Sequence, residues 1–361
     1  MNPATEKTVK HKHMLKRTVR FGPSTCFLCS APLRSKNRSD EHVFPKWLQN
    51  RFNLWNQRLD LINTTSVPYR QLTIPCCKTC NNVHLGKLEK IMQSAIESGP
   101  NAVDKLPAAT VYMWLSKIFY GILYRESLLR ADRRRGNRPI VSKAALQELR
   151  LHHDFMQGIR RSLEFPFGIP GSIFLFGTAA PDRPNEQFDF LDNHANLSIA
   201  LRMGSVGIVC CLQDGGMTKR FHDHLKRPYY RKNRLHPLQF REATAEVFYK
   251  SMLLESTAFY TIAETLDKIQ IITQMPPNIG FRDWDWLLYC RILGHYWNQP
   301  VEEIYGGEIG RASSLKGEGN KFLKLDPNAH YKMMVPDKWR AAQQQIAEGA
   351  DEGAETDSLG G

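Results

Sequence analysis

Two Cys-x-x-Cys pairs are the residues whose type and spacing most clearly indicate chemistry in this sequence. Cys26 and Cys29 form the first pair, Cys77 and Cys80 form the second, and 47 residues separate the pairs. Four thiolates at this spacing are typical of a tetrahedral zinc site, whereas a hydrophobic core favours aliphatic side chains. We therefore expect a structural zinc ion that ties together the two ends of the insert. Cys76 is the alternative to Cys77 as a ligand.

A carboxylate followed by a histidine lies inside this insert. Glu41 directly precedes His42, which stands three residues before Pro45, and Asn81 and His84 follow the last cysteine pair. Hydrolysis of a phosphodiester needs a divalent cation that neutralises the phosphate and a base that takes a proton from water. Histidine titrates near neutral pH, and a carboxylate with an amide or imidazole can bind Mg²⁺. Glu41, His42, Asn81 and His84 are therefore the candidate catalytic set.

Each of these residues also has an ordinary structural interpretation. A histidine beside a carboxylate is commonly a hydrogen-bonding residue, and Asn81 suits a turn or a helix cap. The alternative to catalysis is a non-catalytic zinc protein that binds nucleic acid or acts as a scaffold.

The combined pattern resembles the zinc-clamped HNH endonucleases, which have the ββα-metal fold. The shared elements are Cys-x-x-Cys, acid-His-x-x-Pro and Cys-x-x-Cys-Asn, within residues 23–97. The resemblance implies His42 as general base, Glu41 and Asn81 as ligands of a catalytic Mg²⁺ or Mn²⁺, and His84 as a further ligand or phosphate contact. It implies a metal-dependent endonuclease acting on DNA, which could be the effector of a defence or mobile-element system.

The resemblance has two departures from the family pattern. Glu41 stands where the family usually has Asp or His. The middle Asn of the family motif could correspond to Asn63 or to Gln71, so that position stays open.

Composition indicates a globular protein with a negatively charged partner. Of the 361 residues, 42% are apolar and 24% are charged, and the formal net charge is +13. Such an excess of Lys and Arg favours nucleic acid as partner. The eight cysteines do not have the spacing of a secreted disulfide framework, and neither a signal peptide nor a run of about 18 apolar residues is present. We therefore expect a soluble, cytoplasmic protein with no membrane contact.

Three basic segments are candidates for binding the phosphates of nucleic acid: 1–22, 130–138 and 219–236. Cations for phosphates and aromatic rings for bases are what such a surface needs. The candidate nucleic-acid-binding residues are Arg134, Arg135, Lys226, Arg227, Tyr229, Tyr230 and Arg231.

Hydrophobic periodicity predicts an α+β protein. Apolar residues at helical spacing predict helices over 81–96, 106–131, 142–163, 238–266 and 284–297. Alternating apolar residues predict strands over 70–74, 172–177, 187–191, 197–203 and 206–212, with Gly204-Ser205 as a two-residue hairpin loop. Cys210 and Cys211 fall in the last strand and are interpreted as packing residues on its opposite faces.

Together with the resemblance, which implies the N-terminal nuclease module, these elements predict five regions along the chain. An N-terminal ββα-metal HNH module with its zinc is followed by a helical segment and a mixed α/β C-terminal region. The regions are a basic flexible arm (1–22), the nuclease module (23–98), the helical segment (99–170), an α+β domain of unknown role (171–335) and a disordered acidic tail (336–361). Residues 100–335 could also contact a protein partner or a second copy of the chain.

Overall fold

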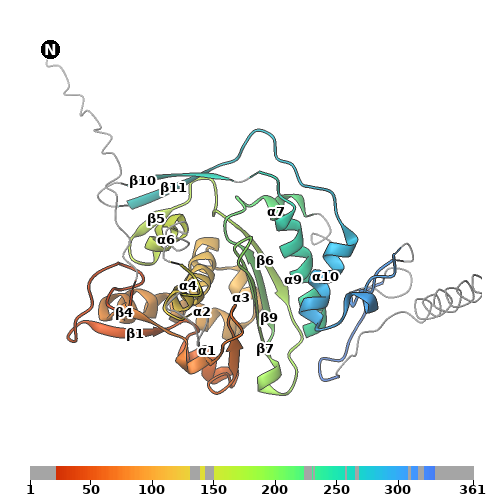
Figure 1. Cartoon of the computed structure of the whole chain (residues 1–361), viewed down its shortest axis with the longest axis horizontal. Helices are drawn as coiled ribbons and strands as arrows, with labels where there is room; N and C mark the ends of the chain where they lie inside the picture. The colour runs from red at the N-terminus through yellow and green to blue at the C-terminus, as the bar shows by residue number, and fades with distance from the viewer. Residues whose placement is uncertain are drawn as a thin grey trace, which may run out of the picture.

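The computed structural model of the chain describes residues 22–130, 139–142, 150–222, 230, 232–256, 258–264, 268–307, 310–315 and 321–329. The predicted acidic tail, nearly all of the predicted arm and the central part of the basic segment 219–236 lie outside these residues. The described part has a mixed α and β architecture (Figure 1), as the sequence predicts.

A four-stranded antiparallel sheet with the order β6-β9-β8-β7 stands at the centre of the molecule. Its strands are β6 (Ser172–Gly177), β7 (Phe188–Asn193), β8 (Ser198–Met203) and β9 (Val206–Cys211). Met203 pairs with Val206 across the predicted hairpin, where Gly204 has a φ of 60° that favours glycine. All four strands agree with the prediction to within two residues.

The sheet separates two hydrophobic cores. Ile199, Leu201 and Cys210 belong to the core on one face, whereas Ala200 and Cys211 belong to the core on the other. Neighbouring strand residues point to opposite faces, which explains this division. Both cysteines are fully buried, so their predicted role in packing is confirmed.

Helices cover both faces of the sheet (Figure 1). The long helix α4 (Ala108–Ser127) packs on the first face and is buried along most of its length. On the second face lie α9 (Pro237–Met252) and α10 (Trp286–Trp297), which contact each other. The central helix α4 therefore lies between the sheet and the N-terminal region that contains the cysteine pairs.

The N-terminal region is built on an antiparallel pair of strands, β1 (Arg38–His42) and β4 (Thr73–Cys77). Its other elements are α1 (Lys46–Arg51), β2 (Arg58–Asp60), β3 (Ser66–Pro68), the 3₁₀ turn η1 (Tyr69–Gln71), the π-helix η2 (Thr79–Leu85) and α2 (Gly86–Ser98). The side chains of this region belong to the same hydrophobic core as α4 and the first face of the sheet.

The remaining elements connect these layers. A second sheet, of order β10-β11-β5, lies beside α6 (Figure 1). The elements are α3 (Pro100–Asp104), α6 (Arg150–Met156), η3 (Gln157–Ile159), β5 (Ser162–Glu164), η4 (Pro184–Glu186), α7 (Met217–Phe221), β10 (Phe259–Glu264), β11 (Lys268–Gln274) and η6 (Val301–Glu303).

Three predicted elements differ from the structure. The helix predicted over 238–266 ends at Met252, because residues 259–264 pair with β11, and their aromatic and β-branched side chains suit a strand. The helix predicted over 142–163 ends before residue 162, because residues 162–164 form β5 and pair with β11. The strand predicted over 70–74 begins at Thr73, since Arg70 and Gln71 belong to η1.

No helix among the described residues combines the length and the apolar character that crossing a bilayer would require.

Acidification should destabilise the fold through His152 on α6. This imidazole is 1% exposed, and burial lowers its pKa to about 4 from an unfolded value of about 6.5. Because the unfolded chain binds the proton more tightly, this contribution to stability is complete above pH 6.5 and is lost as the pH falls toward 4. Urea unfolding should show about 3 kcal/mol lost over that range. A His152→Gln variant should lose less stability on acidification, and equal losses in both proteins would contradict the assignment.

Candidate active site

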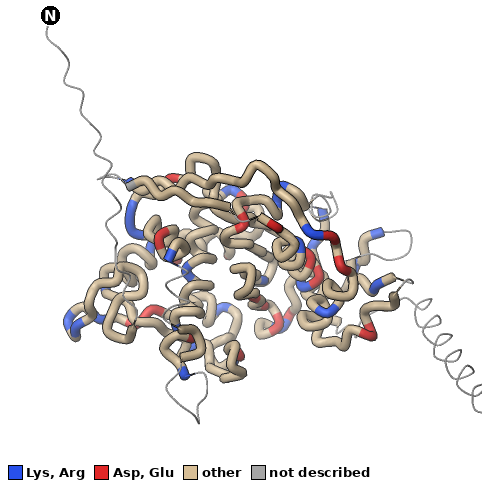
Figure 2. Tube along the Cα trace, turned by 45° about the horizontal axis from the view of Figure 1, so that its top comes forward, with Lys and Arg blue, Asp and Glu red and all other residues tan. Residues whose placement is uncertain are grey.

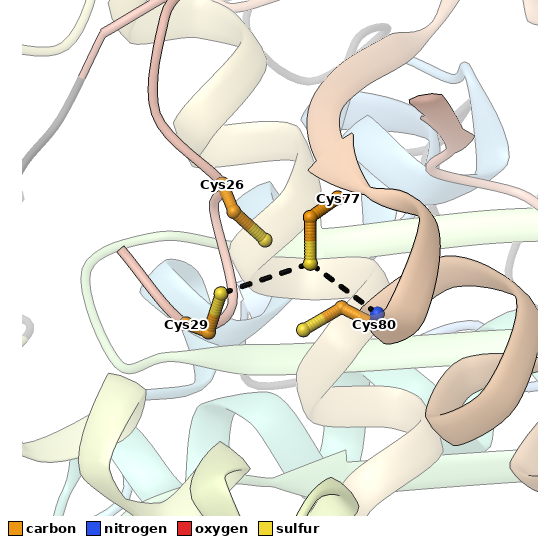
Figure 3. A group of neighbouring side chains, drawn as sticks. All are labelled: Cys26, Cys29, Cys77 and Cys80. Atoms are coloured by element: carbon orange, nitrogen blue, oxygen red, sulfur yellow. Dashed lines mark hydrogen bonds between the residues drawn. The ribbon is translucent and has the colours of Figure 1, made fainter. Parts of the chain in front are cut away.

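The four predicted zinc ligands gather at one point. Cys26 and Cys29 lie on the loop before β1, Cys77 ends β4, and Cys80 lies in η2, and Figure 3 shows their sulfur atoms directed toward a common centre. Their sulfurs lie within 4.8 Å of one another. Those of Cys29 and Cys77 are 3.8 Å apart, the separation expected from tetrahedral Zn–S bonds of about 2.3 Å.

Local backbone geometry prepares these thiols for a cation. The backbone N–H of Cys80 donates to Sγ of Cys77 at 3.4 Å, and the N–H of Ser30 donates to the carbonyl of Cys26 at 2.8 Å in a tight turn. Hydrogen bonds from the neighbouring thiols, that of Cys29 foremost, lower the pKa of Cys26. The donor set therefore fits a structural zinc ion bound by thiolates.

Cys76 is the fifth sulfur near this cluster. It lies on β4 beside Cys77, is fully buried, and has its Sγ 3.9 Å from Sγ of Cys26. The four sulfur atoms that lie within 4.8 Å of one another include that of Cys77 and not that of Cys76.

The cysteine cluster joins the strand pair to the helix that follows it. On β1 and β4, Arg38 is opposite Cys77 and His42 is opposite Thr73. The chain then enters η2, which continues directly into α2. An antiparallel strand pair followed directly by a helix is thus present, with α1, β2, β3 and η1 between the two strands, and a fold by itself does not establish an activity.

His42 lies at the end of β1 and is half-buried. Its ring stacks on Trp55, with the ring centroids 6.1 Å apart and an angle of 27° between the planes. Burial lowers the pKa of His42, and the positive charges of Lys46 and Lys117 lower it further. The imidazole is therefore neutral at pH 7 and has a nitrogen lone pair that can accept a proton.

Asn81 connects the helix to the strand that contains His42. Its Nδ2 donates to Oγ of Ser39 at 2.8 Å and to the carbonyl of Asp40 at 3.2 Å. His84 lies one turn further along η2, is half-buried, and has its pKa lowered by burial and by Arg160. The structure thus places Asn81 against β1 and His84 on the same π-helix.

Glu41 lies on the other side of β1 from His42, because side chains alternate along a strand. Its residue is 7% exposed, and its Oε1 is 2.6 Å from Nζ of Lys117 on α4. Burial raises the pKa of Glu41, an effect that Lys117 opposes. The structure therefore engages Glu41 in an internal ion pair, in place of its predicted role as a metal ligand.

Lys117 is the centre of a buried network behind the strand. Its Nζ donates to the carbonyls of His42 and Val43 at 2.9 and 3.1 Å and to Oε1 of Glu89 at 3.2 Å. Burial lowers the pKa of Lys117, but the carboxylates of Glu41 and Glu89 outweigh that effect and raise the pKa overall. A protonated lysine therefore fixes the backbone at His42 from inside the protein.

The rest of this network comes from two tryptophans. Oε2 of Glu89 accepts hydrogen bonds from Nε1 of Trp47 and of Trp114, each at 3.0 Å. A Cβ on Gly121 of α4 would lie 3.2 Å from Val43, so this glycine allows the helix to approach β1 closely. Helix α4 is thus held against the strand by both packing and charge.

Several residues at this site were missed from the sequence. The only available signal for Asp40 was its position two residues before His42, which places both on the same side of a strand. A lysine inside the apolar run of α4 indicated a buried charge that needs a partner, but nothing in the sequence identified Glu41 and Glu89 as its partners.

Asn63 and Gln71, the two candidates for the middle Asn of the HNH motif, lie in different elements of the N-terminal region. Asn63 lies between β2 and β3, where its Oδ1 accepts from the N–H of Thr65 and its Nδ2 donates to the carbonyl of Arg130, both at 3.0 Å. Gln71 is exposed at the end of η1. Asn63 therefore stabilises a turn, and the assignment of the middle position stays open.

The predicted nucleic-acid-binding residues fall largely outside the described part of the chain. This applies to Arg134, Arg135, Lys226, Arg227, Tyr229 and Arg231. Tyr230 is 3% exposed and packs edge-on against Phe176, with ring centroids 5.9 Å apart. The ring of Tyr230 is therefore buried beside β6 and is not exposed for stacking on a base.

Comparisons with known proteins found no relative for this chain: no protein-family model, no curated protein and no solved structure matches it.

Proposed function

We propose that this chain is an HNH-type endonuclease that hydrolyses the phosphodiester bonds of DNA with the help of a divalent cation. The observation that supports it most is the placement of His42. It lies at the end of β1, which pairs with β4, and Asn81 of the π-helix η2 is hydrogen-bonded to β1. A cluster of four thiols joins the loop before β1 to β4 and to η2. π-Helices are rare and occur frequently at functional sites.

In this proposal His42 removes a proton from the attacking water. Its ring is oriented by Trp55, and its backbone carbonyl is held by Lys117. A zinc ion held by the four cysteines would shape the site and take no part in the reaction. A half-buried ring that packs against Trp55 on a fixed stretch of backbone suits a general base, which needs a defined direction toward its water.

The donors available for a catalytic Mg²⁺ or Mn²⁺ differ from those predicted. Glu41 does not fit this role because its carboxylate is bound to Lys117. Asp40 lies on the same side of β1 as His42 and remains as the carboxylate, together with Asn81 and His84. Its side chain is 55% exposed, and its ion pair with Arg38, at 3.5 Å, is on the surface, whereas that of Glu41 is buried. When bound there, the cation would neutralise charge on the phosphate and the leaving oxygen.

A second candidate function is a non-catalytic zinc protein that binds nucleic acid. It is favoured by one observation: within the part of the chain that the structure describes, Cys26, Cys29, Cys77 and Cys80 are the one gathered set of three or more His, Cys, Asp or Glu ligands. Such a protein would use His42 and Asn81 only to support the fold.

Incubation of the purified protein with supercoiled plasmid separates these functions. We expect nicked and linear DNA with added Mg²⁺ or Mn²⁺, no products without them, and loss of cleavage in His42→Ala. A parallel incubation with single-stranded RNA tests the substrate class. Nicking that persists in His42→Ala would remove His42 from its role. Binding of DNA without cleavage under every cation would favour the second candidate.

A further inference from the structure

A pocket lined by four arginines lies next to the candidate active site. Its volume is about 490 Å³, and it is formed by β3, η1, the strand β2 and the last turn of α4. The arginines are Arg58, Arg70, Arg125 and Arg130, and no Asp or Glu is among the lining residues. Elsewhere in the described chain, Lys and Arg are interspersed with Asp and Glu (Figure 2). A concave site with four cations and no acid requires an explanation.

None of the four pocket arginines forms an ion pair with a carboxylate in the described part of the chain. Arg58 donates from Nε to Oγ of Ser66 at 3.0 Å, which is a neutral acceptor. Arg70 likewise donates to the carbonyl of Trp55 and to the side-chain oxygen of Asn56. These contacts fix the direction of the two guanidinium groups but leave their positive charge unneutralised.

Arg125 has the least satisfied guanidinium of the four. It is half-buried at the end of α4, and its Nε is shielded from solvent without a hydrogen-bond partner. Burial lowers the pKa of Arg125, and the negative charge of Asp40 partly restores it. Burying a cation without an acceptor is unfavourable, so an anion that entered the pocket would relieve this cost.

The pocket is connected to His42 by a contact through Trp55 and by an electrostatic interaction between Arg125 and Asp40. Arg70 binds the carbonyl of Trp55, and the ring of Trp55 stacks on His42. Arg125 is close enough to Asp40 for that carboxylate to affect its pKa, and Asp40 precedes His42 by two residues on β1. Trp55 is also 38% exposed, which leaves an aromatic surface between the pocket and the histidine.

We infer that this arginine pocket binds the phosphate groups of the nucleic-acid strand that passes His42, and so anchors the substrate beside the bond that is cleaved. The inference rests on the proposed function, whose substrate-binding surface it supplies. Guanidinium groups bind phosphate oxygens in a bidentate manner, and fixed arginines without acidic neighbours suit a phosphodiester backbone. Backbone contacts of this kind position the strand and do not read its sequence.

The test measures DNA binding by variants of Arg70 and Arg125. Anisotropy of a short labelled DNA duplex, without added divalent cation, is recorded over a range of salt concentrations for Arg70→Gln and Arg125→Gln. The control is Arg291→Gln, which removes the same charge from an exposed site on α10, on the opposite side of the molecule from β1 and β4 (Figure 1). Zinc content and thermal unfolding establish that each variant is folded.

We expect each pocket variant to raise the Kd about tenfold, and to reduce the slope of log K against log salt by about 0.9 for each lost phosphate contact. The control should bind like the wild type. Variants that bind as tightly as the control, with the wild-type salt slope, would overturn the inference. It would also be overturned if inorganic triphosphate bound the wild type but not Arg125→Gln while DNA binding stayed unchanged, since the ligand would then be a small polyphosphate.

Failure of this inference can be distinguished from failure of the proposed function. Cleavage of plasmid by the wild type, together with unchanged DNA binding by the variants, removes the pocket and leaves the endonuclease. Loss of DNA binding in the variants, together with a wild type that cleaves nothing, supports the pocket and removes the endonuclease.

Discussion

Replacement of Cys26 or Cys77 by serine is expected to abolish zinc binding and to unfold the N-terminal region. Zinc bound by four thiolates contributes about 10–16 kcal/mol to the folding of small zinc domains, as much as the whole stability of an ordinary protein. The thiols join the loop before β1 to the end of β4, and the surrounding side chains share one core with α4. Loss of zinc should therefore reduce helical circular dichroism as well as metal content.

Cys76→Ser is the matched control for this experiment. It alters a buried cysteine adjacent to the cluster, so it should cost about 1–3 kcal/mol for burying a hydroxyl but leave one zinc per chain. Metal content by mass spectrometry and urea unfolding measure both effects. Retained zinc in Cys26→Ser and Cys77→Ser, or its loss in Cys76→Ser alone, would show that the ligand set is different.

Lys117→Met should be the most destabilising change outside the zinc cluster. Lys117 is fully buried and binds the carboxylates of Glu41 and Glu89. Its removal leaves two buried carboxylates without a cation, which costs about 3–5 kcal/mol. It also removes the donors to the carbonyls of His42 and Val43, so the end of β1 should become less ordered.

The triple variant Lys117→Met, Glu41→Gln and Glu89→Gln is the control for this network. With no buried charge remaining, it should recover most of the lost stability, because neutral replacements of buried ion pairs are often tolerated. Urea unfolding at pH 7 gives the comparison. A single Lys117→Met variant as stable as the wild type would contradict the assignment of a protonated, doubly paired lysine.

The parts of the fold that are specified by neighbouring residues were predicted correctly from the sequence. The hairpin of β8 and β9 is specified by alternating apolar residues and by Gly204 at the turn, and the prediction agrees with the structure. The helix predicted to continue to residue 266 was wrong, because residues 259–264 pair with β11. Pairing between segments is a tertiary effect that a single window of sequence does not contain.

The candidate site was likewise predictable only where neighbouring residues specify it. The cysteine spacing correctly predicted which four thiols gather, because the ligands of a zinc site are specified by residue type and spacing. The role of Glu41 was not predictable, since it depends on Lys117, which lies 76 positions later in the chain. The arginine pocket likewise combines residues from β2, η1 and α4, which no local pattern connects.

The rate of DNA cleavage by His42→Ala tests the central claim most directly. A positioned general base contributes about 10²–10⁴-fold to a hydrolysis rate. With Mg²⁺ or Mn²⁺ and excess enzyme, we predict at least about a hundredfold slower cleavage than in the wild type, with unchanged zinc content and unchanged DNA affinity. His295→Ala, at an exposed position on α10, should cleave at the wild-type rate. Equal rates for His42→Ala and the wild type would contradict the account.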